Sequence, residues 1–116
     1  MTDEPTDSKG MRPLGDFECA VLLAVARLDQ TAYGISIRTE LTARLGRDIS
    51  IGAIYTTLER LRKKGLVTAV HGEPTPERGG RAKKFYAIED LGLAALDHTR
   101  RASEAVWGMD LSPQTT

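Results

Sequence analysis

Residues 51–64 of this 116-residue chain place hydrogen-bond donors on one side of a predicted helix and apolar residues on the other. Apolar residues recur at steps of three, four and three, the spacing of one buried helical stripe: Ile51, Ile54, Leu58 and Leu61. The opposite side carries Gly52, Thr56, Glu59, Arg60 and Lys63. Guanidinium, ammonium and hydroxyl groups bind phosphates and the edges of bases, so this side suits a nucleic acid.

A second basic segment follows at residues 78–86, Arg-Gly-Gly-Arg-Ala-Lys-Lys-Phe-Tyr. The β-forming residues at 66–70 and 84–88 flank a Pro- and Gly-rich stretch, which predicts a hairpin with a long tip. An arginine beside two glycines suits a narrow minor groove, and lysines that adjoin a strand suit phosphates. The contacts expected from this hairpin are Arg78, Gly80, Arg81, Lys83 and Lys84.

The distribution of charge supports a polyanionic partner although the net charge is zero. Residues 51–88 hold eight Lys or Arg against three Asp or Glu, whereas residues 1–30 hold three against six and residues 89–116 two against five. A phosphate backbone meets the local field of the protein rather than its total charge.

Other chemistries find little support in the sequence. Cys19, His71 and His98 lack the close spacing of metal ligands, and no nucleophile, base and orienting group form a catalytic motif. We therefore expect no catalytic residue, metal or cofactor. A single cysteine excludes an internal disulfide, and no apolar run approaches the ~20 residues of a membrane span. The polar N-terminus has no signal-peptide core, which predicts a cytoplasmic protein without a membrane partner.

Helices are expected on both sides of these basic segments. Asp16 is expected to cap a helix over residues 17–28, whose apolar run at 20–26 needs cover on more than one side; in so small a domain a second subunit would supply it. A second helix is expected to begin at Thr31 or Ala32 and to stop at Gly46.

Ser50 is expected to cap the basic helix and Gly65 to end it, and a last helix should run over residues 90–107. The domain organisation that follows is a DNA-binding domain at 11–88, a C-terminal helical region at 89–111, and disordered tails at 1–10 and 112–116.

Three motifs resemble the PadR family of bacterial transcriptional regulators. Residues 33–37, Tyr-Gly-Ile-Ser-Ile, resemble the family's Tyr-Gly-Tyr-Glu-Ile, and residues 52–61 resemble its Gly-x-Ile-Tyr-x-x-Leu-x-x-Leu recognition helix. Residues 80–86 resemble its wing signature Gly-Arg-Pro-Arg-Lys-Tyr-Tyr, with Ala82 in place of the proline. The order and separation of the three motifs also match, over roughly residues 14–107.

The resemblance implies a mainly helical α+β fold: a winged helix-turn-helix with a two-stranded wing and a C-terminal dimerisation helix. It implies a homodimeric repressor on a double-stranded operator, released in some relatives by a small aromatic effector. We expect Trp107 either to pack in the dimer interface or to contact such an effector. The expected dimer contacts are Phe17, Val21, Leu96, Val106 and Trp107.

The recognition helix is expected to contact DNA through Ser50, Gly52, Tyr55, Thr56, Arg60, Lys63 and Lys64. For Tyr55 an alternative is a ring at the edge of the core with its hydroxyl in solvent. Two alternatives for the whole protein stay open: a winged-helix protein-interaction module that does not bind DNA, and a repressor switched by a metal or a thiol.

Overall fold

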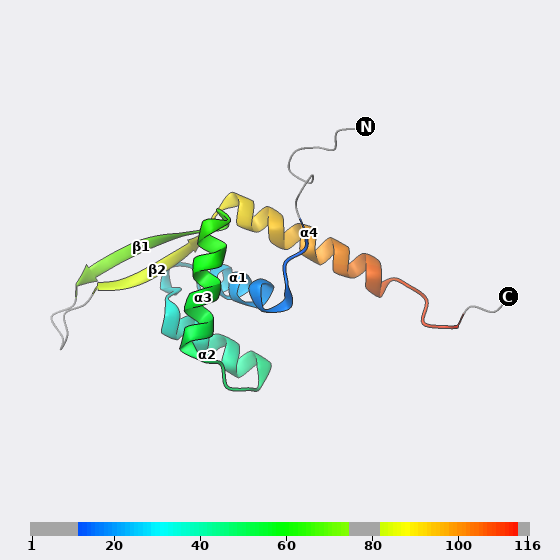
Figure 1. Cartoon of the computed structure of the whole chain (residues 1–116), viewed down its shortest axis with the longest axis horizontal. Coiled ribbons are helices and arrows are strands. Elements are labelled where there is room, and N and C mark those ends of the chain that lie inside the picture. The colour runs from blue at the N-terminus through cyan, green and yellow to red at the C-terminus, as the bar shows by residue number, and fades with distance from the viewer. Residues whose placement is uncertain (1–11, 75–81, 114–116) are drawn as a thin grey trace.

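The computed structural model describes residues 12–74 and 82–113. In this part of the chain the elements are α1 (Asp16–Leu28), the 3-10 turn η1 (Asp29–Thr31), α2 (Gly34–Leu45), α3 (Ile51–Lys63), β1 (Val67–Pro74), β2 (Ala82–Ile88) and α4 (Asp90–Trp107). The two strands form an antiparallel hairpin, so the predicted mainly helical α+β class is confirmed. The hairpin and α4 extend in opposite directions from the packed helices (Figure 1).

The core forms where α1, α2 and α3 pack together. Ile54, Leu58 and Leu61 are fully buried, which confirms the apolar stripe predicted for α3. They meet side chains from the other two helices, Val21, Leu22, Val25 and Ile37. This packing holds α3 by one side and leaves its polar side in solvent.

The predicted signals at both ends of α3 are confirmed. The Ser50 side chain accepts a hydrogen bond of 3.1 Å from the backbone N–H of Ala53, as an N-cap does. At the other end Gly65 has a φ of +79°, and the N–H of Leu66 donates to the carbonyl of Leu61 at 3.0 Å. Gly46, with a φ of +68°, ends α2 as expected.

Two predicted helix starts are wrong. Gly15 is the N-cap of α1, and Asp16 is the first helical residue rather than the cap. The second helix begins at Gly34, because Ala32 is held in an extended conformation by a bond of 2.8 Å from the Tyr86 N–H to its carbonyl. The side chain of Ser36 accepts from the Tyr33 N–H at 2.9 Å and so starts the helix there.

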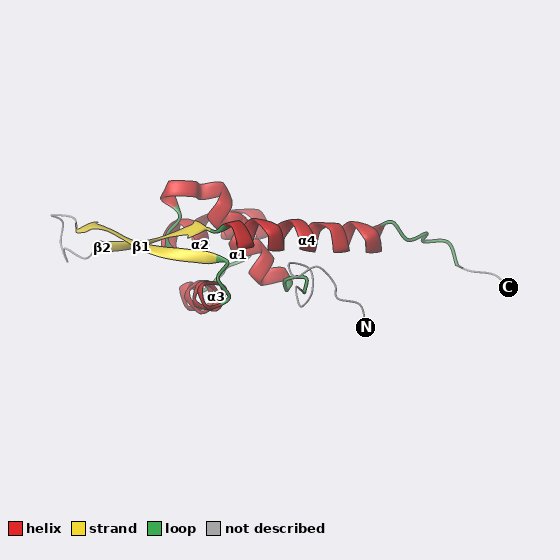
Figure 2. Cartoon of the chain, turned by 90° about the horizontal axis from the view of Figure 1, so that it is seen from above, coloured by secondary structure: helices red, strands yellow, loops and turns green. Residues whose placement is uncertain are grey.

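The hairpin pairs Val67 with Ile88 and continues in register to His71 and Lys84, before an irregularity next to Pro74. Its strands reach farther toward the tip than the predicted spans of 66–70 and 84–88. Figure 2 shows α3 along its axis beside this hairpin and α4 leading away from it.

The last helix covers the predicted residues, Asp90–Trp107. Gly92 allows it to pack closely against the base of the hairpin, because a Cβ there would lie 2.8 Å from Cγ1 of Ile88 and 3.2 Å from the carbonyl carbon of Leu66. The backbone N–H of Leu14 donates to Oγ1 of Thr99 at 3.0 Å and ties the start of α1 to α4. The predicted tail at 1–10 lies outside the described residues, and so does the predicted tail at 112–116 apart from residues 112 and 113, where the N–H of Ser112 donates to Oδ1 of Asp110 at 3.0 Å.

Candidate nucleic-acid interface

The exposed face of α3 is centred on Gly52, Thr56 and Lys63. At about 100° per residue these three fall within about 40° of one another, on the side opposite Ile54 and Leu61. All three are exposed, and a Cβ on Gly52 would meet nothing within 4 Å. The helix therefore presents a smooth first turn, followed by a hydroxyl and an ammonium.

The side of α3 next to the hairpin carries an acid as well as cations. Glu59 accepts two hydrogen bonds from Arg62, at 2.7 and 2.9 Å. This pairing lowers the pKa of Glu59 below its ordinary value, and the charges of Lys84 and Lys63 lower it further. The charge of Lys84 in β2 thus acts on an acid of α3. A depression on this surface is lined by Tyr55, Thr56, Glu59, Arg60 and Lys63.

The side of α3 next to α1 ends in an interhelical ion pair. Nζ of Lys64 lies 3.0 Å from Oε2 of Glu18, and Nη1 of Arg60 lies 3.9 Å from the same oxygen. The Lys64 ammonium is thus directed at an α1 carboxylate, a contact that the sequence pattern did not indicate. Lys63, in contrast, forms no ion pair with another residue of the described ranges.

Tyr55 lies over α2 while keeping 46% of its surface exposed. A Cβ on Gly34 would lie 2.7 Å from Cε1 of this ring, so the glycine makes room for it. Next to Gly34, the ring of Tyr33 meets Phe85 edge-on with 5.4 Å between centroids. The Tyr-Gly motif thus joins α2 to both α3 and the hairpin.

The described residues include only part of the DNA-contact set predicted for the hairpin. Lys84 is exposed, and its ammonium lies 6.0 Å from the centre of the Tyr86 ring. Arg78, Gly80 and Arg81 lie outside the described residues, and of Lys83 only the backbone position in β2 is described.

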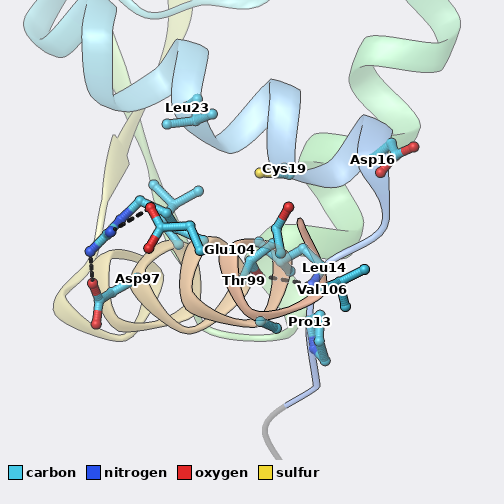
Figure 3. Close-up of a pocket in the computed structure, with 13 residues that line it drawn as sticks. Pro13, Leu14, Asp16, Cys19, Leu23, Asp97, Thr99, Glu104 and Val106 are labelled. Atoms are coloured by element: carbon cyan, nitrogen blue, oxygen red, sulfur yellow. Dashed lines mark hydrogen bonds and ion pairs between the residues drawn. The ribbon is translucent and has the colours of Figure 1, made fainter. Parts of the chain in front are cut away.

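A second surface lies between α1 and α4, where a groove of about 830 Å³ opens (Figure 3). Cys19 and Leu23 reach it from α1, and Leu96, Thr99 and Val106 from α4. Partial burial, with a smaller effect of the Asp16 charge, raises the pKa of the Cys19 thiol above its ordinary value.

The predicted dimer residues divide by exposure. Val21 has no exposed surface, so its assignment to the dimer interface is wrong; the packing of α1 on α2 and α3 buries it in the core. Leu23, two residues on, is the exposed side chain of that run. Phe17 and Leu96 are partly buried against the core, whereas Val106 and Trp107 are exposed.

Two other kinds of site are absent from the described residues. No three side chains of His, Cys, Asp or Glu gather there in a way that could hold a metal ion. None of the helices in residues 12–74 and 82–113 combines the length and apolarity that crossing a bilayer requires.

Comparison with known proteins points to one family. Residues 22–98 match the model of the transcriptional regulator PadR-like family. A stretch of 76 residues is 36% identical to Transcriptional regulator Rv3488 of Mycobacterium tuberculosis and covers 66% of each chain, just under two thirds of that relative's length.

Solved structures show the same fold. A PadR-like transcriptional regulator from Bacillus cereus superposes with a TM-score of 0.64 at 25% identity, over 78% of this chain and 84% of that one. A complex structure of hsRosR-S4 gives a TM-score of 0.67 at 24% identity, over 90% and 83%.

Proposed function

The chain belongs to the PadR-like family of transcriptional regulators, and from this premise we propose that it is a homodimeric repressor that binds duplex DNA in the cytoplasm. It is a regulator and not an enzyme. Its activity then consists of binding, so the residues that matter are those that meet DNA and those that join two subunits.

The main support for DNA binding is the exposed face of α3. Gly52 lets the helix approach the floor of a major groove, and Thr56 and Arg60 then face base edges. Lys63 meets a phosphate at the rim of the groove. Ser50 keeps its hydroxyl hydrogen for a phosphate while it caps the helix, and Tyr55 offers its exposed edge beside it.

The hairpin acts as the wing. We assign a phosphate contact to Lys84, whose charge acts on Glu59 of α3, and the same role to Lys83. For the tip we propose that Arg81 enters the minor groove, with Arg78 and Gly80 supporting it.

Dimerisation gives each operator two recognition helices. Exposed apolar side chains gather along α4 and beyond it, at Val106, Trp107, Met109 and Leu111, and Leu23 on α1 is also exposed. A monomer gains by burying such side chains, and one patch used twice across a two-fold axis covers both copies. Phe17 and Leu96 would complete the contact.

The proposal includes control by a small aromatic effector. An aromatic compound that stacks on Trp107 between two subunits would change how the two recognition helices are spaced, and so release the operator. The groove between α1 and α4 is large enough for a small molecule and lies beside the proposed interface, which supports this proposal.

Selection of bound fragments from random duplex DNA tests the function. We expect pseudo-palindromic sites whose half-sites are about 10–10.5 base pairs apart, from centre to centre. A protein that fails to bind even bulk duplex at low salt would instead be a protein-interaction module. If a metal ion or oxidation of Cys19 controls binding, the metal- or thiol-switched alternative holds.

A further inference from the structure

We propose that Glu18 is a positioning residue for DNA binding: its carboxylate engages Lys64 and withholds this lysine from phosphates, which limits binding to non-cognate DNA. The inference rests on the proposed DNA-binding function. It assigns to α1, outside both the recognition helix and the wing, a part in setting specificity.

The contact is tertiary and well defined. Nζ of Lys64 lies 3.0 Å from Oε2 and 3.3 Å from Oε1 of Glu18, which is 46 residues away in the sequence. The Glu18 side chain is only 12% exposed, whereas that of Lys64 is 47% exposed. The carboxylate is therefore fixed in the packed first turn of α1, and the lysine reaches it from the end of α3.

The burial of the Glu18 carboxylate favours its pairing with Lys64. A carboxylate that is largely removed from water depends on its cation, and taking the cation away leaves a poorly solvated charge. If Lys64 moved to a phosphate, Glu18 would lose that compensation close to the DNA backbone. Within the described residues, Arg60 would then be the cation still paired with it, at 3.9 Å. Drawing Arg60 toward Glu18 would take it from the bases.

Lys63 provides a built-in comparison. It precedes Lys64 in the last turn of the helix, but its side chain leaves the helix about 100° away from that of Lys64, near the centre of the exposed face. No ion pair joins it to any residue that the structure describes, although its charge helps to lower the pKa of Glu59. The two adjacent lysines should therefore differ: Lys63 binds a phosphate, and Lys64, which the sequence led us to expect at the DNA, does not.

The pairing of Glu18 with Lys64 should reduce the non-specific binding of DNA. Non-specific affinity comes mainly from cations that displace counterions from DNA, and each such cation adds about 0.9 to the slope of log affinity against log salt. A lysine that an internal carboxylate already neutralises adds nothing to that slope. Glu18 therefore lowers affinity for random duplex while leaving the base-facing side chains in place, which raises the ratio of specific to non-specific binding.

Salt dependence of binding to operator and random duplex tests the proposal, using wild type, Lys63→Ala and Lys64→Ala. Lys63→Ala should lower the slope by about 0.9 for each phosphate that is no longer bound, and Lys64→Ala should leave it unchanged. Glu18→Gln should steepen the slope and strengthen random-duplex binding more than operator binding. Adding Lys64→Ala to Glu18→Gln should restore the wild-type slope.

Glu59→Gln is the matched control. It removes an acid from the same basic surface, but this acid pairs with Arg62 instead of Lys64. Adding Lys64→Ala to Glu59→Gln should not change the slope. Thermal unfolding of each variant separates a loss of stability from the effect on salt dependence, which a purely structural role would not alter.

The outcomes are distinct. If Lys64→Ala lowers the slope in the wild-type background as much as Lys63→Ala does, Lys64 binds phosphate and the proposal is overturned. This comparison remains decisive even if Glu18→Gln fails to fold. A wild-type protein that binds no duplex at low salt would overturn the proposed function itself.

Discussion

Arg60 lies between two roles. Its side chain is 55% exposed, yet its Nη1 lies 3.9 Å from Oε2 of Glu18. At that distance a half-exposed pair contributes little, so the side chain keeps its freedom to reach a base. We therefore assign Arg60 to base recognition and Lys63 to a phosphate.

Arg60→Ala should weaken operator binding far more than binding to random duplex. A side chain that reads a base contributes roughly 1–3 kcal/mol of discrimination, whereas a phosphate contact contributes equally on all sequences. Competition binding with the operator and a scrambled duplex measures the difference. An equal loss on both would place Arg60 among the phosphate contacts.

At the scale of elements, local signals predicted both ends of α3, the end of α2 and the bounds of α4, whereas a long-range contact set the start of α2. Ser50 and Gly65 lie within the helix ends that they specify, so their residue types were enough. The start of α2 was missed because the bond between Ala32 and Tyr86 depends on the hairpin. The pairing of Glu18 with Lys64 was missed for the same reason, since neither helix alone shows it.

Two glycines should respond oppositely to alanine. Gly52→Ala should stabilise α3 by up to about 1 kcal/mol, because nothing lies within 4 Å of the added methyl group, yet it should weaken operator binding. Gly92→Ala offers a similar gain in helix propensity, but overpacking against Leu66 and Ile88 costs about 1–3 kcal/mol and should dominate. Thermal unfolding with operator titration measures both. Destabilisation by Gly52→Ala, or a stabilising Gly92→Ala, would contradict these placements.

Alanine substitutions in the wing should separate its two modes of DNA binding. Lys83→Ala and Lys84→Ala should weaken all duplexes alike and lower the salt slope by about 0.9 for each phosphate that the wing no longer binds. Arg81→Ala should cost most on operators with A-tract flanks, where the minor groove is narrow. Affinities for operators with A·T-rich and G·C-rich flanks give the comparison. A loss that ignores the flanks would assign Arg81 to phosphate binding.

At the scale of the whole molecule, α4 has two halves with different surroundings. Ala95 is buried, Leu96 packs against the core, and Thr99 bonds Leu14. Beyond Ala102 the side chains are exposed, including Val106 and Trp107. The first half therefore belongs to the DNA-binding unit, and the second half is the candidate dimer contact. A truncation that tests the dimer contact must therefore begin beyond Ala102, because a truncation that starts at Ala95 would also remove part of the core.

Deletion of residues 103–116 should leave a folded monomer that binds its operator weakly. The side chains assigned to DNA contact remain, but binding at the second half-site is no longer effectively intramolecular, which should cost about 100-fold or more in operator affinity. Binding to random duplex at low salt should change much less. Sedimentation and operator titration of the truncated and full-length proteins measure both effects.

Trp107, the single tryptophan, gives an independent measure of the same interface in the full-length protein. The residue is 80% exposed in the isolated chain, so dimerisation through α4 should shield it from a dissolved quencher such as acrylamide. Quenching should then increase as the protein is diluted toward monomer, in step with the loss of sedimenting dimer. If quenching does not change across that dissociation, or if the protein without residues 103–116 still sediments as a dimer, the subunits meet through another surface. The two recognition helices would then be held about one DNA turn apart, roughly 34 Å, by contacts other than those of α4.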